Sequence, residues 1–203
     1  MPFELISLYD LPKVPWKNGA GLMREIAVEP RGAGADTLDW KLSWAETTKN
    51  SPFSAFPGVD RSIILLRGAG LRLKMLKDAT VVNFVAPREP FFFSGDDQID
   101  AELVGGPTEN LSILLRRDRF WTAATWIDTG ADLPPADALF VLCMTGTVRL
   151  AGKDARPVTL HAQQAALWRK GSGALQVEPV ARPPLALVVR IGSHDASKTT
   201  NAP

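Results

Sequence analysis

The amino-acid sequence predicts an all-β protein made of two tandem barrels of antiparallel strands. Three observations lead to this prediction. Apolar and polar residues alternate along most of the chain, glycine or proline stands in nearly every gap between alternating segments, and three segments of the first half return in the same order in the second. Alternation with a period of two is typical of a half-buried strand, and many short strands separated by turns are typical of a sandwich or barrel.

The alternation is clearest in the segment 39–45, where two tryptophans and a leucine share one face while Lys41 and Ser43 lie on the other. We expect the remaining strands, in chain order, at 4–8, 24–29, 62–67, 70–76, 80–86, 90–94, 99–104, 111–117, 120–127, 139–144, 147–151, 157–161, 164–168, 174–178 and 185–191. Helix is expected only as a single turn near 49–55, and residues 29–38 read as a Gly/Ala-rich loop.

Three pairs of similar segments, separated by 74 to 77 residues, suggest that the two halves are related. The pairs are 65–73 with 142–150, 99–102 with 175–178, and 111–116 with 185–190. A unit of about 75 residues with six to eight short strands has the size of one small jelly roll. The expected architecture is therefore a bicupin, two tandem jelly-roll (double-stranded β-helix) units. We place them at 1–118 and 119–192, followed by a polar, disordered tail at 193–203.

Composition narrows the range of partners and compartments. The chain has 23 basic and 22 acidic residues and a net charge of +1, whereas nucleic acid or an anionic membrane favours a broad positive surface. Its single cysteine, Cys143, cannot form a disulfide within the chain, which favours a reducing compartment. No apolar run reaches the roughly 20 residues of a membrane span, and the first residues do not resemble a signal peptide. We therefore expect a cytoplasmic protein that binds neither nucleic acid nor a membrane.

The histidine count argues against a metal centre. Metal-dependent cupins combine two or three histidines with a carboxylate, but this chain has only His161, alone at a strand end, and His194, which lies in the expected tail. We expect no bound metal and no cofactor. Serine hydrolase chemistry lacks both its Gly-x-Ser-x-Gly turn and a histidine base. Only acid–base chemistry by a carboxylate or a lysine remains open.

Two clusters of polar and turn-forming residues stand out in the first third. Residues 16–27 run from a glycine-rich turn into a strand and carry Asn18 and Arg24, and residues 51–61 form a stiff aromatic turn that ends in Arg61. The guanidinium of an arginine can hold a carboxylate through two parallel hydrogen bonds. The alternative is purely structural: an ordinary β-turn with surface charges in the first cluster, and an ion pair between Arg61 and its neighbour Asp60 in the second.

Together with the segment 40–45, these clusters resemble the HutD/Ves family. The family pattern is Trp-x-Asn-Gly-x-Gly-x-x-Arg-Glu-Ile, then Trp-x-x-Ser-x-Ala, then Gly/Ser-Pro-Phe-Ser-x-Phe-Pro-Gly-x-Asp-Arg. The chain matches it at 16–26, 40–45 and 51–61, and beyond Arg117 the resemblance fades to a shared strand pattern. The chain departs from the family at three positions, where glycine, threonine and asparagine are more usual: Ala20, Met23 and Ser112.

The resemblance implies a metal-free bicupin associated with bacterial histidine utilisation, which binds the pathway intermediate urocanate or formylglutamate and modulates the pathway. On this hypothesis Arg61 pairs with the carboxylate of a small anionic metabolite. Asn18 and Ser43 hydrogen-bond its other polar atoms, and Arg24 adds positive potential. A flat wall for a planar ring is expected from Phe53, Phe56 or Trp44.

A metal-independent isomerase or lyase acting on a small carboxylate is the alternative function. It needs a carboxylate or lysine with a shifted pKa, for which Glu25, Lys17 and Asp60 are the candidates. We favour binding over catalysis and assign no catalytic residue. The sequence leaves open the ligand, a homodimeric assembly, the role of the C-terminal unit, and the HutD-like or Ves-like branch.

Overall fold

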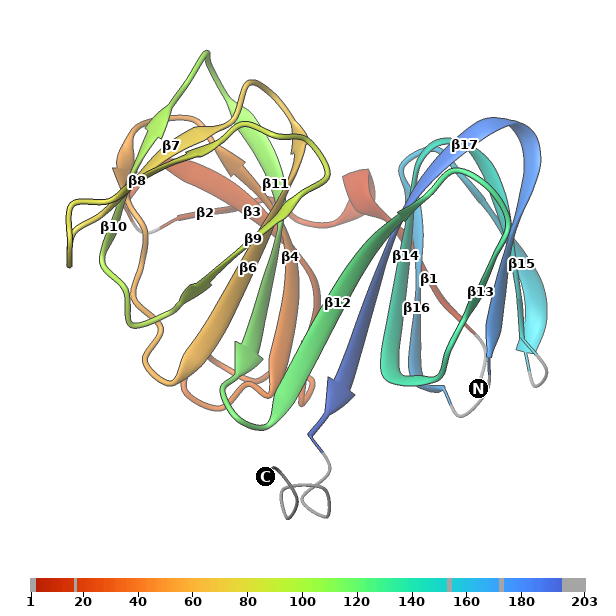
Figure 1. Ribbon diagram of the computed structural model, residues 1–203. Helices are drawn as coiled ribbons and strands as arrows, with labels where there is room; N and C mark the ends of the chain where they lie inside the picture. Colours follow the sequence, from red (N-terminus) through yellow and green to blue (C-terminus); the bar gives the residue numbers. More distant parts are fainter. Residues whose placement is uncertain (1–2, 17, 153–154, 172–173, 195–203) are drawn as a thin grey trace, which may run out of the picture. The chain divides into compact units, whose positions relative to one another are not determined.

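A computed structural model describes residues 3–16, 18–152, 155–171 and 174–194. Within these ranges the regular structure consists of strands and one short 3-10 helix, η1 (Leu8–Asp10). The chain forms two compact units: the N-terminal unit is Leu11–Arg119, and the C-terminal unit combines Phe120–Pro203 with Met1–Asp10 (Figure 1). None of the helical structure in the described ranges has the length and hydropathy of a membrane span.

Two antiparallel sheets make up the N-terminal unit. One sheet has the strand order β2-β3-β4-β11-β6-β9, and the other has the order β5-β10-β7-β8. The strands are β2 (Val14–Pro15), β3 (Gly21–Glu29), β4 (Trp40–Thr47), β5 (Ser51–Pro52), β6 (Val59–Arg67), β7 (Leu71–Met75), β8 (Val81–Phe84), β9 (Pro90–Ser94), β10 (Ile99–Leu103) and β11 (Thr108–Arg116).

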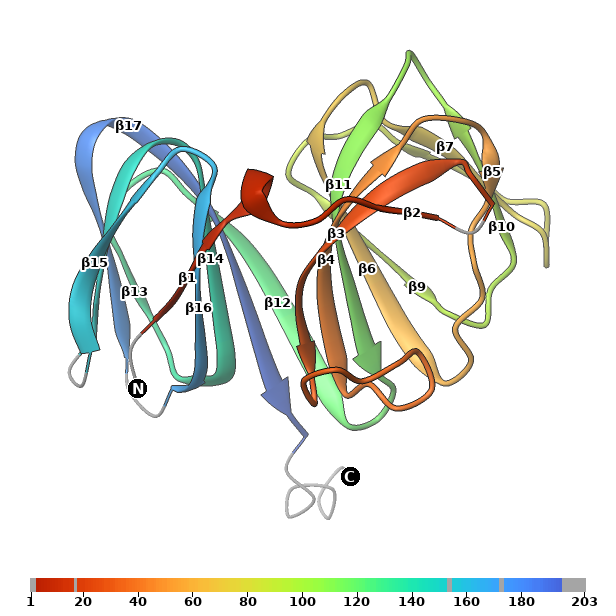
Figure 2. The same ribbon diagram turned by 180° about the vertical axis from the view of Figure 1, so that it is seen from behind.

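The C-terminal unit is built on one sheet of order β1-β16-β14-β17-β12, with β13 paired to β17 and β15 paired to β14. Its strands are β1 (Glu4–Ser7), β12 (Phe120–Ile127), β13 (Ala131–Leu133), β14 (Ala136–Gly152), β15 (Ala155–His161), β16 (Gln164–Gly171) and β17 (Leu175–Ser193). Figure 2 shows β1 beside β16, the strand with which it pairs.

The two units share the order of their central strands. The order β4-β11-β6-β9 in one corresponds to β12-β17-β14-β16 in the other, and β5-β10-β7-β8 corresponds to β13-β17-β14-β15. The repeated segments also pair in matching register, since Leu73 faces Ala101 and, at the repeat offset, Leu150 faces Val177. The internal repeat read from the sequence thus has a counterpart in the strand pairing.

The all-β prediction is confirmed, but three details of the prediction are wrong. Residues 49–55 contain no helical turn, because Ser51–Pro52 form β5. The strands expected at 139–144 and 147–151 form the single strand β14, and those expected at 174–178 and 185–191 form β17. The reason is that register shifts between Cys143 and Val148 bend these long strands where the N-terminal unit has open turns.

The unit boundary lies at Phe120, next to the expected one, but the first ten residues belong to the C-terminal unit. The cause is the antiparallel pairing of β1 with β16, which local patterning does not reveal. The disordered tail was expected to begin at residue 193, but Ser193 is the last residue of β17. Residues 195–203 lie outside the described residues.

The core of the N-terminal unit lies between its two sheets. Ile63 and Leu65 of β6 pack in one buried cluster with Leu71 and Leu73 of β7. Full burial of such a side chain contributes about 1.5–3 kcal/mol relative to exposure. This packing identifies the inner face of the six-stranded sheet, on which the candidate site is found.

Candidate functional site

Strand register places Arg61 on the inner face of the six-stranded sheet. Arg61 precedes the core residue Ile63 by two positions in β6, so the two side chains share a face. Residues directly opposite one another in adjacent strands also share a face. The row containing Arg61 therefore includes Leu114 of β11 and, opposite Leu114 on β4, Lys41.

The next row along the same face carries hydroxyl groups. Ser112 of β11 lies opposite Ile63 on one side and opposite Ser43 of β4 on the other. Ser43 in turn lies opposite Glu25 of β3. The structure thus brings two of the predicted site residues, Arg61 and Ser43, to one inner face and leaves the tryptophans of β4 on the other.

Buried polar side chains are concentrated on this face. Of the six buried polar residues in the described ranges, five lie on the inner face of β4 and β11, and Ser62 lies on the opposite face. The five are Ser43, Thr47, Thr108, Asn110 and Ser112. Because a buried polar group costs free energy unless it is hydrogen-bonded, such a concentration favours a binding surface over a simple core.

Aromatic rings surround the guanidinium of Arg61. Its Cζ lies 4.8 Å from the ring centroid of Phe93, 5.1 Å from that of Phe56 and 5.3 Å from that of Phe53. Its Nη1 donates a hydrogen bond to the backbone oxygen of Ser54 at 2.9 Å, whereas its Nε is buried and has no partner among the described residues. Burial lowers the pKa of Arg61 to about 10, so the group stays charged at neutral pH.

The hydroxyl of Ser43, like the Nε of Arg61, is buried without a hydrogen-bond partner among the described residues. Ser43 is 3% exposed, and its Oγ has no hydrogen-bond partner within the described part of the chain. The hydroxyls of Thr47 and Ser51 are also buried without a partner there. An unsatisfied buried donor or acceptor costs about 1–3 kcal/mol, and a ligand with polar atoms would remove that cost.

An ion pair borders this polar surface. The Nζ of Lys41 lies 2.6 Å from a carboxylate oxygen of Glu25, and the two side chains are 17% and 45% exposed. Both residues belong to the inner face by register. The charge of Lys41 is therefore neutralised by the carboxylate of Glu25, which lies on the neighbouring strand β3.

Asn18 and Arg24 are not brought into this cluster. Asn18 is exposed, and its side-chain oxygen accepts a hydrogen bond from the backbone N–H of Ala20 at 3.1 Å within its own turn. Arg24 lies opposite Trp44, on the face away from Ser43, and its Nη1 donates to the backbone oxygen of Leu11 at 2.7 Å. Alternation along the strand explains the position of Arg24.

The structure does not contain the ion pair considered between Asp60 and Arg61. These neighbours in β6 point to opposite faces, and Asp60 pairs with Arg117 at 2.7 Å. Arg117 also pairs with Asp96 at 2.7 Å, and its hydrogen bond holds the pKa of Asp96 below the ordinary value. Lys17, the third acid–base candidate, lies outside the described residues.

Sequence reasoning missed Lys41, Asn110 and Ser112 as members of the cluster. The alternation in β4 had already placed Lys41 on the same face as Ser43, so that signal was available. Ser112 had been noted only as a departure from the family pattern. Its place opposite Ser43 depends on the pairing of β4 with β11, strands far apart in the sequence.

The histidines and the cysteine lie in ordinary structural settings. The ring Nδ1 of His161 lies 3.3 Å from the hydroxyl of Thr147, and His194 is exposed. Within the described ranges, no three histidine, cysteine, aspartate or glutamate side chains are grouped as metal ligands would be. Cys143 is buried, and this burial raises the pKa of its thiol.

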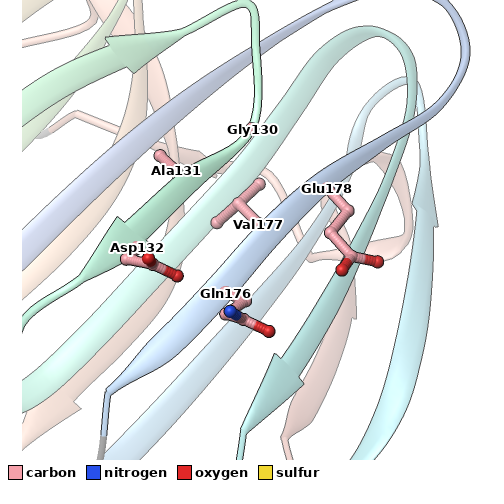
Figure 3. A pocket seen from close by; sticks show the side chains of 6 residues that line it. All are labelled: Gly130, Ala131, Asp132, Gln176, Val177 and Glu178. Atoms are coloured by element: carbon pink, nitrogen blue, oxygen red, sulfur yellow. The ribbon is translucent and has the colours of Figure 1, made fainter.

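A surface hollow in the C-terminal unit provides a contrast. It has a volume of about 230 Å³ and is lined by Gly130, Ala131, Asp132, Gln176, Val177 and Glu178 (Figure 3). Asp132 and Glu178 are exposed carboxylates, and the lining includes no cationic side chain. An anionic ligand would therefore find no ion-pair partner among these lining side chains.

Comparisons with known proteins agree on one family. The HutD family model matches residues 9–183. An uncharacterised 21.2 kDa protein in the hutC 3′ region of Pseudomonas putida is 30% identical over 161 residues, which are 78% of this chain and 83% of that protein. Protein Ves of Citrobacter koseri is 32% identical over 173 residues, 83% of this chain and 86% of that protein.

Solved structures agree on the fold. HutD from Pseudomonas fluorescens SBW25 superposes with a TM-score of 0.80 at 23% identity, covering 95% of this chain and 99% of that one. A cupin 2 conserved barrel domain protein from Leptotrichia buccalis superposes with a TM-score of 0.60 at 10% identity, covering 94% of this chain and 96% of that one. At these identities the likeness shows a cupin-like all-β fold.

Proposed function

The chain belongs to the HutD family, and from this we propose that it binds a small anionic intermediate of histidine degradation and thereby modulates histidine utilisation. Membership of the family suggests a role in histidine utilisation. The proposed ligand is urocanate or formylglutamate, and the proposed site is the inner face of the N-terminal unit. We further propose that the two units are tandem cupin barrels, a bicupin, because their strand orders correspond.

The observation that supports this function best is the state of Arg61. Its Nη1 is engaged by a backbone carbonyl, while its buried Nε has no partner among the described residues. Nε and Nη2 lie along one edge of the guanidinium, and that edge can donate two parallel hydrogen bonds to a carboxylate. The three surrounding phenylalanines, Phe53, Phe56 and Phe93, shield such a pair from water and offer flat apolar faces to a planar ligand.

The neighbouring hydroxyls fit the remainder of such a ligand. Ser43 and Ser112 lie opposite one another in the row next to Arg61, and each hydroxyl can both donate and accept. Diagonal neighbours in a sheet are about 7–8 Å apart. A small metabolite with a carboxylate at one end and a polar group at the other can therefore contact both Arg61 and Ser112.

The acid–base candidates give less support to catalysis. Glu25 is in an ion pair with Lys41, and Asp60 lies on the opposite face in an ion pair with Arg117. An isomerase or lyase needs a group that exchanges a proton with the bound substrate. The binding function therefore has the stronger structural support.

Calorimetric titration with urocanate and formylglutamate tests the proposal. Because a hydrogen bond to a charged group is worth about 1.5–3 kcal/mol, Arg61→Ala should weaken binding by roughly 10- to 150-fold. Arg61→Lys should recover only part of this loss, since an ammonium cannot form two parallel bonds. The matched control is Arg72→Ala, which removes an exposed arginine from the outer side of β7. Unchanged affinity in a folded Arg61→Ala protein would make Arg61 a structural residue.

A further inference from the structure

Four charged side chains belong to the inner face of the six-stranded sheet by register: Glu25, Lys41, Arg61 and Arg116. Arg116 lies at the end of β11, where its Nε and Nη2 donate to backbone carbonyls of the 36–38 segment at 3.2 and 2.8 Å. Lys41 is paired with Glu25 at 2.6 Å. Arg61 is thus the cation of this face that retains a buried N–H without a partner among the described residues.

Lys41 and Arg61 are close enough to act on one small ligand. They lie in the same cross-strand row, separated only by Leu114 of the intervening strand. Two strand spacings place their Cα atoms roughly 10 Å apart, and both side chains are long. Without Glu25, the row would present two cations to the ligand; with Glu25, it presents one.

We propose that Glu25 is a specificity-determining residue that makes this site selective for monocarboxylates over dicarboxylates. The inference rests on the proposed function of the same site, and of its two candidate ligands it selects urocanate, a monocarboxylate, over formylglutamate, a dicarboxylate. Glu25 cancels the charge of Lys41, so a second carboxylate on the ligand finds no second uncompensated cation in the row of Arg61 and is repelled by the Glu25 carboxylate. The remaining contacts come from the neutral side chains Ser43 and Ser112, which suit an uncharged polar group.

The physical basis is discrimination by repulsion. A binding site separates two ligands by the difference in their binding free energies, and an unfavourable contact with one ligand serves as well as a favourable contact with the other. Two like charges in a partly buried site interact more strongly than in water, because the effective dielectric constant is lower. Lys41 is largely shielded from solvent, and the more exposed Glu25 holds its carboxylate 2.6 Å from the Nζ of Lys41, so the charge balance of this pair acts on a ligand bound beside Lys41.

N-formyl-L-glutamate and N-formyl-L-glutamine are suitable probes. They have nearly the same shape, but the first carries two carboxylates and the second carries one carboxylate and a neutral amide. The measured quantity is the ratio of their dissociation constants, which cancels effects of a variant that weaken both ligands alike. Urocanate, titrated in parallel, reports on the proposed function itself.

Three full-length variants test the assignment. Glu25→Gln frees Lys41 and should shift the ratio toward the dicarboxylate by about tenfold. Lys41→Met leaves Glu25 unpaired and should shift the ratio in the opposite direction. The double variant Glu25→Gln with Lys41→Met restores a neutral pair and should return the ratio to within about twofold of the wild type.

Each outcome decides a different point. If Glu25→Gln changes the dissociation constants of both formyl probes by the same factor, their ratio stays at the wild-type value. That result would overturn the role of Glu25 while leaving the binding function intact. If Glu25→Gln does not fold, the opposite shift expected for Lys41→Met tests the same charge balance. If urocanate and both formyl probes fail to bind the wild-type protein, the proposed function and this inference are both wrong.

Discussion

The two units pair their strands alike, yet their inner faces carry different chemistry. In each unit, the two central strands (β6 with β11, and β14 with β17) shift register after a pair of inner-face residues. This pair is Leu65 with Asn110 in the N-terminal unit and Cys143 with Ala186 in the C-terminal unit. These pairs are the first of three equivalent rows. Asn110 in one unit is thus matched by an alanine in the other.

The second and third rows extend this difference. Ser112 in the second row is matched by Val188, and Arg61 in the third row by Leu139. Lys41, two strands from Arg61, is matched by Ala123. At these matched positions the C-terminal unit carries apolar residues, although Arg190 faces Leu139 in the third row and Thr125 faces Val188 in the second. The fold does not require the polar residues of the N-terminal unit, and this favours a functional reason for their presence.

Exchanging the third-row residues should have the largest effect on stability. Leu139 is 1% exposed within an apolar cluster, so Leu139→Arg would bury an unpaired charge and lower the free energy of unfolding by about 3–5 kcal/mol. The reciprocal change, Arg61→Leu, should leave that free energy unchanged or raise it, because burial already disfavours the charged form of Arg61. Urea unfolding of both variants measures this, and equal losses would contradict the difference between the two inner faces.

Removing the hydroxyl of Ser43 should have an effect of intermediate size. It should weaken ligand binding but leave the stability of the fold unchanged or higher. Ser43→Ala removes a buried oxygen that has no partner in the described ranges, so thermal unfolding should occur at the same or a higher temperature. Ligand affinity should fall by roughly 2- to 12-fold, the value of one ordinary hydrogen bond. The matched control is Thr125→Ala, since Thr125 is the equivalent residue of β12 and is exposed. A parallel loss of stability and affinity in Ser43→Ala would indicate a structural role.

The smallest effect is expected at Arg117, a charged residue of the N-terminal unit outside the inner face. Arg117→Met removes the hydrogen bond that lowers the pKa of Asp96, so an NMR titration should show that pKa rising toward its ordinary value of about 4. A lowered carboxyl pKa stabilises the fold above the unfolded-state pKa, and this contribution disappears as the pH falls through the folded-state value. The stability of variant and wild type should therefore converge in acid.

Arg117→Met also separates a local from a general electrostatic effect. Binding of an anion to Arg61 should change by less than about twofold, because Arg117 pairs with Asp60 on the face that Arg61 does not share. A large loss of affinity would mean that the overall positive potential of the unit, rather than Arg61, attracts the ligand.

The local sequence pattern predicted the position of some residues of the candidate site but not of others. The alternation in β4 predicted that Lys41 and Ser43 share a face, because side-chain direction in a strand depends only on neighbouring residues. The conformation of the Asn18 turn is equally local, but the use of the Asn18 side chain within that turn was not foreseen. The sequence did not indicate which face of the strand carrying Arg24 points inward, because that depends on what packs against it.

Long-range pairing accounts for what was missed. Asp60 pairs with Arg117 rather than with its neighbour Arg61, and Ser43 meets Ser112 only through the β4–β11 ladder. Such contacts join residues more than fifty positions apart. They follow from the topology of the sheet, which the repeat suggested only in outline.

The pairing of β1 with β16 has a consequence for synthesis on the ribosome. Residues 4–7 are made before the N-terminal unit, but their partners at 164–167 are made after it. Translation proceeds at about 5–20 residues per second, so the first strand waits for several seconds while Leu11–Arg119 has already emerged as a complete unit. The C-terminal unit can close its sheet only after the N-terminal unit has had time to fold, which sets the order in which the two units mature.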